Sequence, residues 1–262
     1  MTISLNSDLR AEIAKLVHES HEGHIPSSFS IVDIVESLYA NNINLGMIGS
    51  EDPNRDFFFL SKGHGALALY VVLRKFGLVS EADLASYGQS GSAFAGHPDR
   101  TKHPAIEAST GSLGHGLPMA VGVALGKKIQ KASGRVFCLI GDGETHEGTI
   151  WEAAHFAANH NLDNLIAIVD RNDSALQLLP TDNLVSKFLA FGWEASEVDG
   201  HNLEGLQLKI RELGQATKPK VFIAKTVKGK GVPFMEGHGQ WHHKVPNDEE
   251  LRLILEALGE NL

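Results

Sequence analysis

The stretch from residue 135 to residue 174 constrains the fold more than any other part of the chain. Residues 136–140 and 165–169 are short apolar runs, long enough for central strands and too short for ordinary helices. Between them, residues 151–158 repeat apolar side chains at helical spacing. A strand, a helix and a second strand in this order predict a βαβ unit with two parallel strands.

A polar residue follows each of these two strands. Asp142 stands in a Gly-Asp-Gly turn after the first strand, and Asn172 follows the second. Because ligands gather at the carboxyl ends of parallel strands, we expect both side chains to face one site. Their oxygens suit Mg²⁺, with Ca²⁺ or Mn²⁺ as alternatives. Gly141 and Gly143 are expected to let the backbone turn sharply and approach a bulky anion.

The rest of the chain alternates strands and helices. Three further strands are predicted at residues 57–60, 193–198 and 221–224. The predicted helices cover residues 8–22, 31–42, 66–76, 81–88, 184–191 and 203–213, and a last helix begins at residue 248. This order predicts an α/β protein with a doubly wound, mostly parallel sheet and helices on both faces. No repeat or linker divides the sequence, so we expect residues 1–262 to form a single domain.

Cap residues and loops can be assigned locally. Ser7 is a candidate N-cap for the first helix. Residues 23–30 (GHIPSSFS) read as a loop, closed by a capping box of Ser30 and Asp33. Residues 89–116 form a long stretch rich in Gly, Ser, His and Pro, and long loops in compact domains are usually functional.

The helix opened by Pro118 contains small residues. Gly122, Ala124 and Gly126 recur at every second position, which we expect to permit close packing on the sheet.

Composition excludes several classes of protein. The net charge of −9 disfavours nucleic acid as a partner, since phosphate backbones demand a basic surface. No apolar run approaches the ~20 residues of a membrane span, and the N-terminus lacks the apolar core of a signal peptide. The single cysteine, Cys138, lies in a predicted strand and is expected to be a buried small hydrophobe. These features favour a cytoplasmic protein.

Fourteen histidines raise the alternative of a transition-metal site. His18, His21 and His24 are spaced by three and would lie roughly along one face of a continuous helix. Gly23 is expected to end that helix, however, and no HExxH motif is present. Histidines around a cleft are equally suited to proton transfer near neutral pH.

Several distinctive segments follow one another along the chain. They are GHIPSSFS, LSKGHGALALY, AGHPD, STGSLGHGLPMAVGVALG, the Gly-Asp-Gly unit, KTVKGKG and WHHKVPN. In this order they resemble the transketolase family, and the resemblance spans roughly residues 11–247. It implies the thiamine-diphosphate-binding fold, and specifically its diphosphate-binding domain.

The resemblance also implies roles for individual residues. Asp142 and Asn172 would bind the divalent metal. The segment after Asn172 departs from the family pattern, so the backbone carbonyl that completes the metal shell belongs to Ser174 by spacing or to Leu176 by residue type. The residues implied to contact thiamine diphosphate are His64, Gly111, Ser112, Leu113, Asp142, Gly143, Asn172, Lys225 and His242.

Other implied roles concern the substrate and the subunit interface. His24, His97 and His242 would face the sugar as catalytic residues. Glu147 and Glu152 would lie toward the subunit interface. His243 stands where the family usually has glycine, which could change the substrate entrance.

The resemblance finally implies a partner chain. In this family the glutamate that activates thiamine diphosphate lies in a pyrimidine-binding domain, and that domain is absent from the sequence. We therefore expect the N-terminal subunit of a split transketolase, which becomes active with a C-terminal subunit in a dimer of heterodimers. It would transfer two-carbon ketol units between sugars, with sugar phosphates as the expected class.

Two alternative functions remain open. The chain could be half of another thiamine-diphosphate enzyme, such as a specialised-pathway transketolase-like enzyme or a 2-oxo-acid decarboxylating subunit. It could also be a non-catalytic interaction protein.

Overall fold

Five parallel strands form the centre of the molecule. The computed structural model describes residues 6–175, 179–180, 183–211, 217–237 and 241–260. The strands are β1 (Phe57–Leu60), β2 (Val136–Gly141), β3 (Leu165–Arg171), β4 (Glu194–Asp199) and β5 (Lys220–Lys225). They form one sheet in the order β1-β2-β3-β5-β4, with every pair parallel. The five strands expected from the sequence are confirmed.

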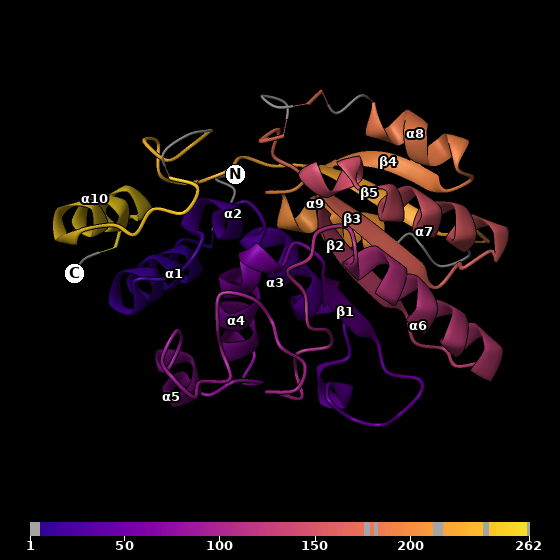
Figure 1. The fold of residues 1–262 in the computed structure, drawn as a ribbon, viewed down its shortest axis with the longest axis horizontal. Helices are drawn as coiled ribbons and strands as arrows, with labels where there is room; N and C mark the ends of the chain where they lie inside the picture. The colour runs from indigo at the N-terminus through magenta and orange to yellow at the C-terminus, as the bar shows by residue number, and fades with distance from the viewer. Residues whose placement is uncertain (1–5, 176–178, 181–182, 212–216, 238–240, 261–262) are drawn as a thin grey trace.

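Helices cover both faces of this sheet (Figure 1). The α-helices are α1 (Ser7–Ser20), α2 (Ile25–Phe29), α3 (Val32–Asn41), α4 (Ala66–Lys75), α5 (Glu81–Ala85), α6 (Gly116–Gln130), α7 (Gly148–Asn159), α8 (Leu184–Ala190), α9 (Leu203–Arg211) and α10 (Asp248–Leu258). Three short 3₁₀ turns are η1 (Leu45–Met47), η2 (Gly63–Gly65) and η3 (Gly143–His146). Among the described residues, no helix combines the length and apolarity needed to cross a bilayer.

Alternation along the strands divides the core into two layers. On β2, Phe137 and Leu139 join the layer that contains α1, α3, α4 and α9. Val136, Cys138 and Ile140 face the opposite layer, formed with α6, α7 and α8. Both faces are apolar because side chains alternate along a strand and each face is covered. The doubly wound architecture follows from this pattern.

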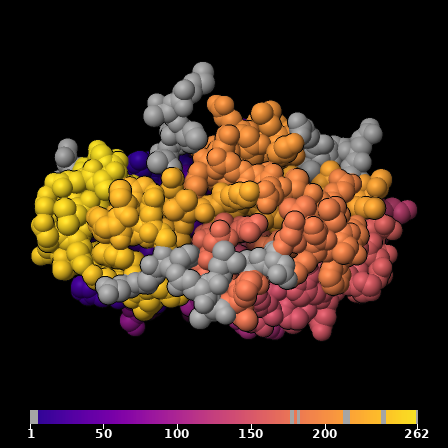
Figure 2. All heavy atoms as spheres, turned by 90° about the horizontal axis from the view of Figure 1, so that it is seen from above, coloured from indigo at the N-terminus to yellow at the C-terminus, as the bar shows by residue number. Residues whose placement is uncertain are grey.

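The C-terminal helix extends the molecule at one end. Helix α10 packs against α1 rather than against the sheet. Seen from above, this part of the chain lies at the opposite end from α6 and α7 (Figure 2). Asn247 caps α10 by accepting from the Glu250 backbone N–H, and Glu250 completes the capping box.

The segment around residues 23–30 differs from the expected loop. Residues 25–29 form the short helix α2, with Pro26 in its first turn. The capping box predicted for Ser30 and Asp33 is wrong, because the Ser30 hydroxyl donates to Ser27 O (3.0 Å) and Asp170 Oδ2 (2.8 Å). The cap predicted at Ser7 is also wrong. Asn6 occupies that position, without a side-chain cap.

The region before and within α6 gives a mixed result. No helix or strand lies between α5 and α6, so the long loop is confirmed within these described residues. Ala124 is fully buried, as expected. Gly122 and Gly126 do not pack closely, since a Cβ at either would meet nothing within 4 Å. The expectation for these two glycines is therefore wrong, because they lie on the face of α6 turned away from the sheet.

A buried ion pair joins α1 to α3. The Arg10 guanidinium donates to Asp33 Oδ2 (2.6 Å) and Oδ1 (3.0 Å), and both side chains are almost fully buried. His201 Nδ1 also contacts Asp33 Oδ2, at 2.8 Å. Burial alone would raise the pKa of Asp33, but hydrogen bonds from His201 and Arg10 hold it well below its usual range. Asp33 therefore stays ionised in the interior.

Removing one member of this ion pair should destabilise the fold. Arg10→Met leaves the Asp33 carboxylate buried without its main partner, which should lower the free energy of unfolding by about 3–5 kcal/mol. Urea denaturation measures the change. The matched control is Arg252→Met, which removes an exposed arginine paired on the surface of α10. A control loss as large as that of Arg10→Met would contradict the burial argument.

Candidate functional site

A pocket opens at the carboxyl ends of β1, β2 and β3. Its volume is about 640 Å³. The lining residues come from α2, from the turns after the strands, and from two long loops. They are His24, Ser27, Lys62, His64, Gly111, Leu113, Gly141, Asp142, Gly143, Glu144, Asn172, Ser174, Ala175, Lys228 and His242.

Asp142 provides an unsatisfied carboxylate oxygen in this pocket. Its side chain is buried, and Oδ1 accepts from the Gly143 backbone N–H at 2.7 Å. Oδ2 is buried and has no hydrogen-bond partner among the residues that the structure describes. Burial, together with the nearby Asp170 carboxylate, raises the pKa of Asp142 to about 6. A buried carboxylate oxygen of this kind calls for a cation or donor, because leaving it unpaired costs free energy.

Asn172 lies beside Asp142 at the end of β3, as the βαβ unit predicts. Its Nδ2 donates to Asp170 Oδ2 (2.8 Å), which turns its Oδ1 toward the loop that follows. Oδ1 accepts from the Ser174 backbone N–H at 3.0 Å. Ser174 also lines the pocket, and Asp173 between them has a φ of 59°. Leu176, the alternative metal ligand, lies outside the described residues.

Asp170 is an organising residue that the sequence reasoning overlooked. It is fully buried on β3. It accepts hydrogen bonds from Ser30, Lys62, Asn172 and Thr226, which come from four separate segments. Burial alone would raise its pKa, but the Lys62 ammonium holds the pKa below the usual value. The signal was an acid two residues before Asn172 inside an otherwise apolar strand.

Glu144 is a second overlooked carboxylate, and it ties three segments together. Its Oε1 accepts from the Ser61 hydroxyl (2.6 Å) and from the Gly114 N–H (2.8 Å). Its Oε2 accepts from the Gly141 N–H (2.8 Å). Burial raises the pKa of Glu144. Because its oxygens are occupied by these donors, we assign it to holding the pocket walls together.

Histidines from three distant segments converge on one side of the pocket. The His24 ring lies 5.5 Å from that of His64 and 5.4 Å from that of His242, measured between centroids. His243 approaches His24 most closely, at 4.5 Å. Burial, followed by the neighbouring imidazoles, lowers the pKa of His24 to about 4. His24 Nδ1 is buried and has no hydrogen-bond partner within the described part of the chain, so it remains able to bond a ligand.

The pKa values of His64 and His242 are lowered as well, which favours the neutral form of both imidazoles. Burial, followed by the Lys62 ammonium, lowers the pKa of His64. Burial, followed by the Lys228 ammonium, lowers the pKa of His242. Lys228 Nζ lies 2.9 Å from His242 Nδ1. Because an ammonium can only donate, Nδ1 is the acceptor, and neutral His242 carries its proton on Nε2.

The loop before α6 brings some expected residues to the pocket and leaves others at its edge. Gly111 and Leu113 line the pocket. His97 is exposed and does not line it, although its ring lies beside Gly111, where an added Cβ would approach His97 Cδ2 to 3.0 Å. Gly111 also has a φ of 149°, which disfavours any side chain. Ser112 is exposed and contacts His115 Nδ1 at 3.3 Å instead of the pocket.

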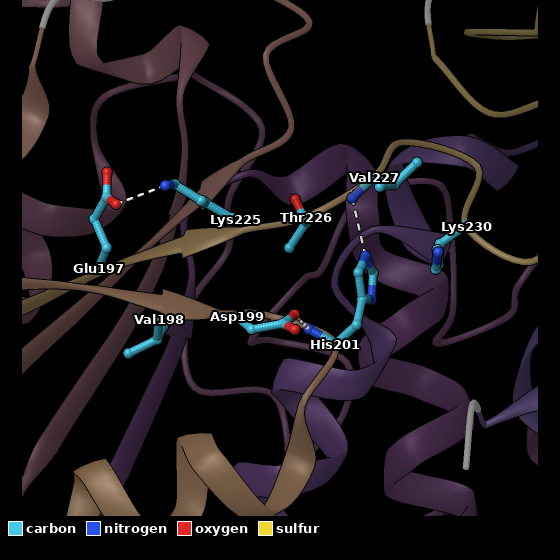
Figure 3. A pocket seen from close by; sticks show the side chains of 8 residues that line it. All are labelled: Glu197, Val198, Asp199, His201, Lys225, Thr226, Val227 and Lys230. Carbon is cyan, nitrogen blue, oxygen red and sulfur yellow. Dashed lines mark hydrogen bonds and ion pairs between the residues drawn. The ribbon is translucent and has the colours of Figure 1, made fainter. Parts of the chain in front are cut away.

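The expected position of Lys225 is wrong. It ends β5 with its side chain 61% exposed, and its Nζ pairs with Glu197 Oε2 of the neighbouring strand at 2.6 Å. This ion pair belongs to a different depression (Figure 3). The lysine that lines the pocket is Lys228, three residues further along, beyond the turn that leaves the strand. KTVKGKG contained both lysines, and strand ends cannot be fixed to one residue from sequence.

The two glycines flanking Asp142 act differently from the expectation. Neither Gly141 nor Gly143 has a positive φ. A Cβ on Gly143 would meet the Ala175 Cβ at an ordinary 3.8 Å. Both line the pocket, so their small size leaves room for a ligand rather than permitting a strained turn.

The histidines considered for a transition-metal site are separated. His18 Nδ1 bonds to the Pro246 carbonyl (2.9 Å), and its Nε2 lies 3.2 Å from Asp248. His21 ends α1 in the left-handed conformation, and His24 turns toward the pocket. Within the described ranges, no group of three or more His, Cys, Asp and Glu side chains is arranged to hold a metal ion.

Glu147 and Glu152 are both exposed, at the start and on the outer face of α7. Their expected place at a subunit interface stays a prediction.

Fold and site together define a class of protein. A doubly wound sheet with a cavity at its carboxyl edge, lined by a free carboxylate oxygen, an amide, lysines and neutral imidazoles, is suited to a phosphorylated cofactor. Comparison with known families makes this specific, because residues 4–261 match the family described as transketolase, thiamine diphosphate binding domain. The chain belongs to the transketolase family.

Individual relatives agree with this assignment. An apulose-4-phosphate transketolase subunit from Actinobacillus succinogenes is 42% identical over 90% of this chain and 87% of its own length. The subunit of the same name from Phocaeicola vulgatus is 35% identical over 100% of this chain and 95% of its own. Human transketolase is 39% identical, but the match covers 95% of this chain and 40% of the human protein.

Solved structures give the same picture. The transketolase of Campylobacter jejuni superposes with a TM-score of 0.87 at 30% identity, covering 99% of this chain and 43% of that chain. The transketolase of Leishmania mexicana gives a TM-score of 0.83 at 28% identity, covering 97% of this chain and 41% of that chain. This chain therefore spans less than half the length of the transketolases whose structures it matches, and most of the length of the two apulose-4-phosphate transketolase subunits.

The histidine cluster predicts a specific pH dependence. An unfolded histidine titrates near pH 6.5, whereas His24 in the fold has a pKa of about 4. Between these values the unfolded state binds a proton that the folded state does not, so stability falls as the pH drops from about 6.5 to about 4. His24→Gln should lose stability less steeply over this window in urea titrations. The control is His146→Gln at an exposed position, which should follow the parent slope. An unchanged slope for His24→Gln would refute the burial of a neutral imidazole.

Proposed function

We propose that this chain is the cofactor-binding subunit of a two-subunit transketolase. It binds thiamine diphosphate with Mg²⁺ and, together with a C-terminal partner subunit, transfers a two-carbon ketol unit from a phosphorylated ketose to an aldose. The observation that carries this proposal is Asp142 Oδ2, which lines the pocket with Asn172 and is buried without a hydrogen-bond partner among the described residues. The family membership and the length shared with the two apulose-4-phosphate transketolase subunits support the same conclusion.

The residues at the strand ends fit a metal-bound diphosphate. Asp142 and Asn172 supply the hard oxygen ligands that Mg²⁺ prefers, with the Ser174 backbone carbonyl as the proposed third ligand. Ca²⁺ and Mn²⁺ fit the same oxygens. The metal ion and the Lys228 ammonium would offset the charge of the diphosphate in a chain of net charge −9. Gly111, Leu113, His64 and His242 would surround the rest of the cofactor.

The imidazoles fit the proton transfers of ketol chemistry. When bound, thiamine diphosphate supplies the electron sink for the carbon–carbon cleavage. His242 would donate from Nε2 to a substrate oxygen, since its Nδ1 accepts from Lys228. His24 would accept or donate at Nδ1, which is buried and has no partner among the residues described. His97 at the pocket edge would contact the sugar beyond the reacting carbons.

The relatives of similar length support a proposal for the substrate class. Two of them are named for apulose 4-phosphate, and this chain matches most of each. We therefore propose a phosphorylated ketose donor rather than a free sugar. The partner would contribute the activating glutamate and further contacts to the phosphate, and we propose a cytoplasmic dimer of heterodimers with Glu147 and Glu152 at an interface.

Loss of the carboxylate should remove the cofactor. Asp142→Ala deletes the proposed metal ligand, so Mg²⁺-dependent binding of thiamine diphosphate should weaken by at least about 100-fold. Thermal stability should be retained, because Asp142 Oδ2 has no hydrogen-bond partner in the described ranges of the chain. Titration calorimetry and circular dichroism measure the two effects. The control Asp163→Ala removes an exposed carboxylate far from the pocket. Unchanged affinity in Asp142→Ala would refute the metal assignment.

The need for a partner is tested by activity. The purified chain alone should show no ketol transfer, and adding the C-terminal subunit should restore it, because the activating glutamate resides there. The assay follows cleavage of a ketose phosphate in the presence of thiamine diphosphate and Mg²⁺. Full activity of the isolated chain would contradict the two-subunit proposal, and absence of activity with the partner across ketose phosphates would contradict the proposed reaction.

A further inference from the structure

His201 is buried in the turn after β4, outside the pocket, and bonds on both sides of its ring. Its Nδ1 lies 2.8 Å from Asp33 Oδ2, and its Nε2 accepts from the Val227 backbone N–H at 2.9 Å (Figure 3). The Val227 N–H can only donate, so Nε2 must be unprotonated and the ring proton resides on Nδ1, facing Asp33. The Asp33 carboxylate thus fixes the tautomer that can hold Val227.

The segment held in this way carries Lys228 into the pocket. Val227 is followed directly by Lys228, and the Gly229 N–H donates to the Pro26 carbonyl of α2 at 3.0 Å. Gly229 has a φ of 79° and leaves no room for a side chain, since a Cβ would lie 2.4 Å from Met235 O. The turn is therefore fixed on one side by His201 and on the other by α2.

The turn that bears His201 is itself locked to the same segment. The Gly200 N–H donates to Lys225 O at 2.8 Å. A Cβ on Gly200 would lie 2.4 Å from the Thr226 methyl group, so the two backbones are in close contact. The His201 N–H is also held, by Asp199 Oδ1 at 2.9 Å. His201 consequently has little freedom to follow Val227 if that segment moves.

We propose that His201 is a positioning residue that acts through Lys228. The sequence of contacts runs from Asp33 to the His201 ring, to the Val227 N–H, to Lys228 and finally to His242 Nδ1. It sets the location of the Lys228 ammonium, and with it the tautomer in which His242 presents Nε2–H to the substrate. This rests on the proposed function for the role of Lys228 and His242, and goes beyond it by naming the residue that orients them.

Two substitutions separate the positioning role from a purely structural one. His201→Asn keeps an amide near the position of Nδ1, which can still donate to Asp33, but removes the acceptor for Val227. His201→Gln can bring its Oε1 near the position of Nε2 to accept from Val227, but gives up the bond to Asp33. His201→Gln should therefore lower the stability of the fold more, because it loses the bond to Asp33. His201→Asn should disturb the position of Lys228 more, because it loses the bond to Val227.

The contact between Lys228 and His242 can be monitored at the His242 side chain. In long-range ¹H–¹⁵N NMR spectra of the full-length chain, His201→Asn should shift the His242 Nδ1 resonance toward its value in Lys228→Met, whereas His201→Gln should leave it near the parent value. Lys225→Met is the matched lysine control and should leave it unchanged, because Lys225 pairs with Glu197 outside the pocket. An unchanged His242 signal in His201→Asn would overturn the proposal.

The readout of function is the affinity for thiamine diphosphate with Mg²⁺, measured by calorimetry on the chain together with its partner subunit. His201→Asn should weaken binding about five- to tenfold, the loss of one hydrogen bond. The double variant with Lys228→Met should bind no more weakly than Lys228→Met alone, because both act through one group. If the losses of affinity caused by His201→Asn and Lys228→Met instead multiply in the double variant, the inference is overturned. If the parent complex binds no thiamine diphosphate, the proposed function fails, and the His242 spectrum still decides the role of His201.

Discussion

The buried Asp170 carboxylate is the interaction on which the functional edge of the sheet depends. It lies at the end of the central strand β3 and is bonded by Lys62 after β1, Ser30 after α2 and Thr226 after β5. An ionised carboxylate is tolerated in the interior because these donors and the Lys62 charge compensate its desolvation. In doing so it fixes the relative positions of segments that are up to 196 residues apart, as counted from Ser30 to Thr226.

The pocket combines compensated and uncompensated groups. Asp170 and Glu144 have their oxygens occupied by protein donors, whereas Asp142 Oδ2 and His24 Nδ1 are buried without partners in the part of the chain that the structure describes. The satisfied groups hold the walls, and the unsatisfied ones are available to a ligand. The two lysines of the pocket differ in the same way. Lys62 is paired with the Asp170 carboxylate, whereas Lys228 contacts the His242 imidazole. Within this polar cluster, some residues thus hold the pocket in shape and others are available to bind a ligand.

Local patterns predicted the elements well and the connections between them less well. The strands at residues 57–60, 136–140 and 165–169 were located to within one or two residues, because buried parallel strands are short apolar runs. Helix α2 was missed because Ile25–Phe29 is too short to show a period. Lys225 was expected at the cofactor from the family resemblance alone, because sequence does not show where β5 ends or which way its last side chain points. Ser112 and His97 were expected with the pocket residues, but the loop keeps them at its edge.

The sequence by itself determined the parallel α/β architecture and the pairing of Asp142 with Asn172. The physical reason is that both depend on order and periodicity along the chain: consecutive strands of a βαβ unit end at the same edge. Only the tertiary structure decided which charges are compensated. That Asp170 is bonded by Ser30, Lys62 and Thr226, and that His201 holds the turn carrying Lys228, depends on contacts between residues distant in sequence. Their distances and burial arise from packing, which no local pattern encodes.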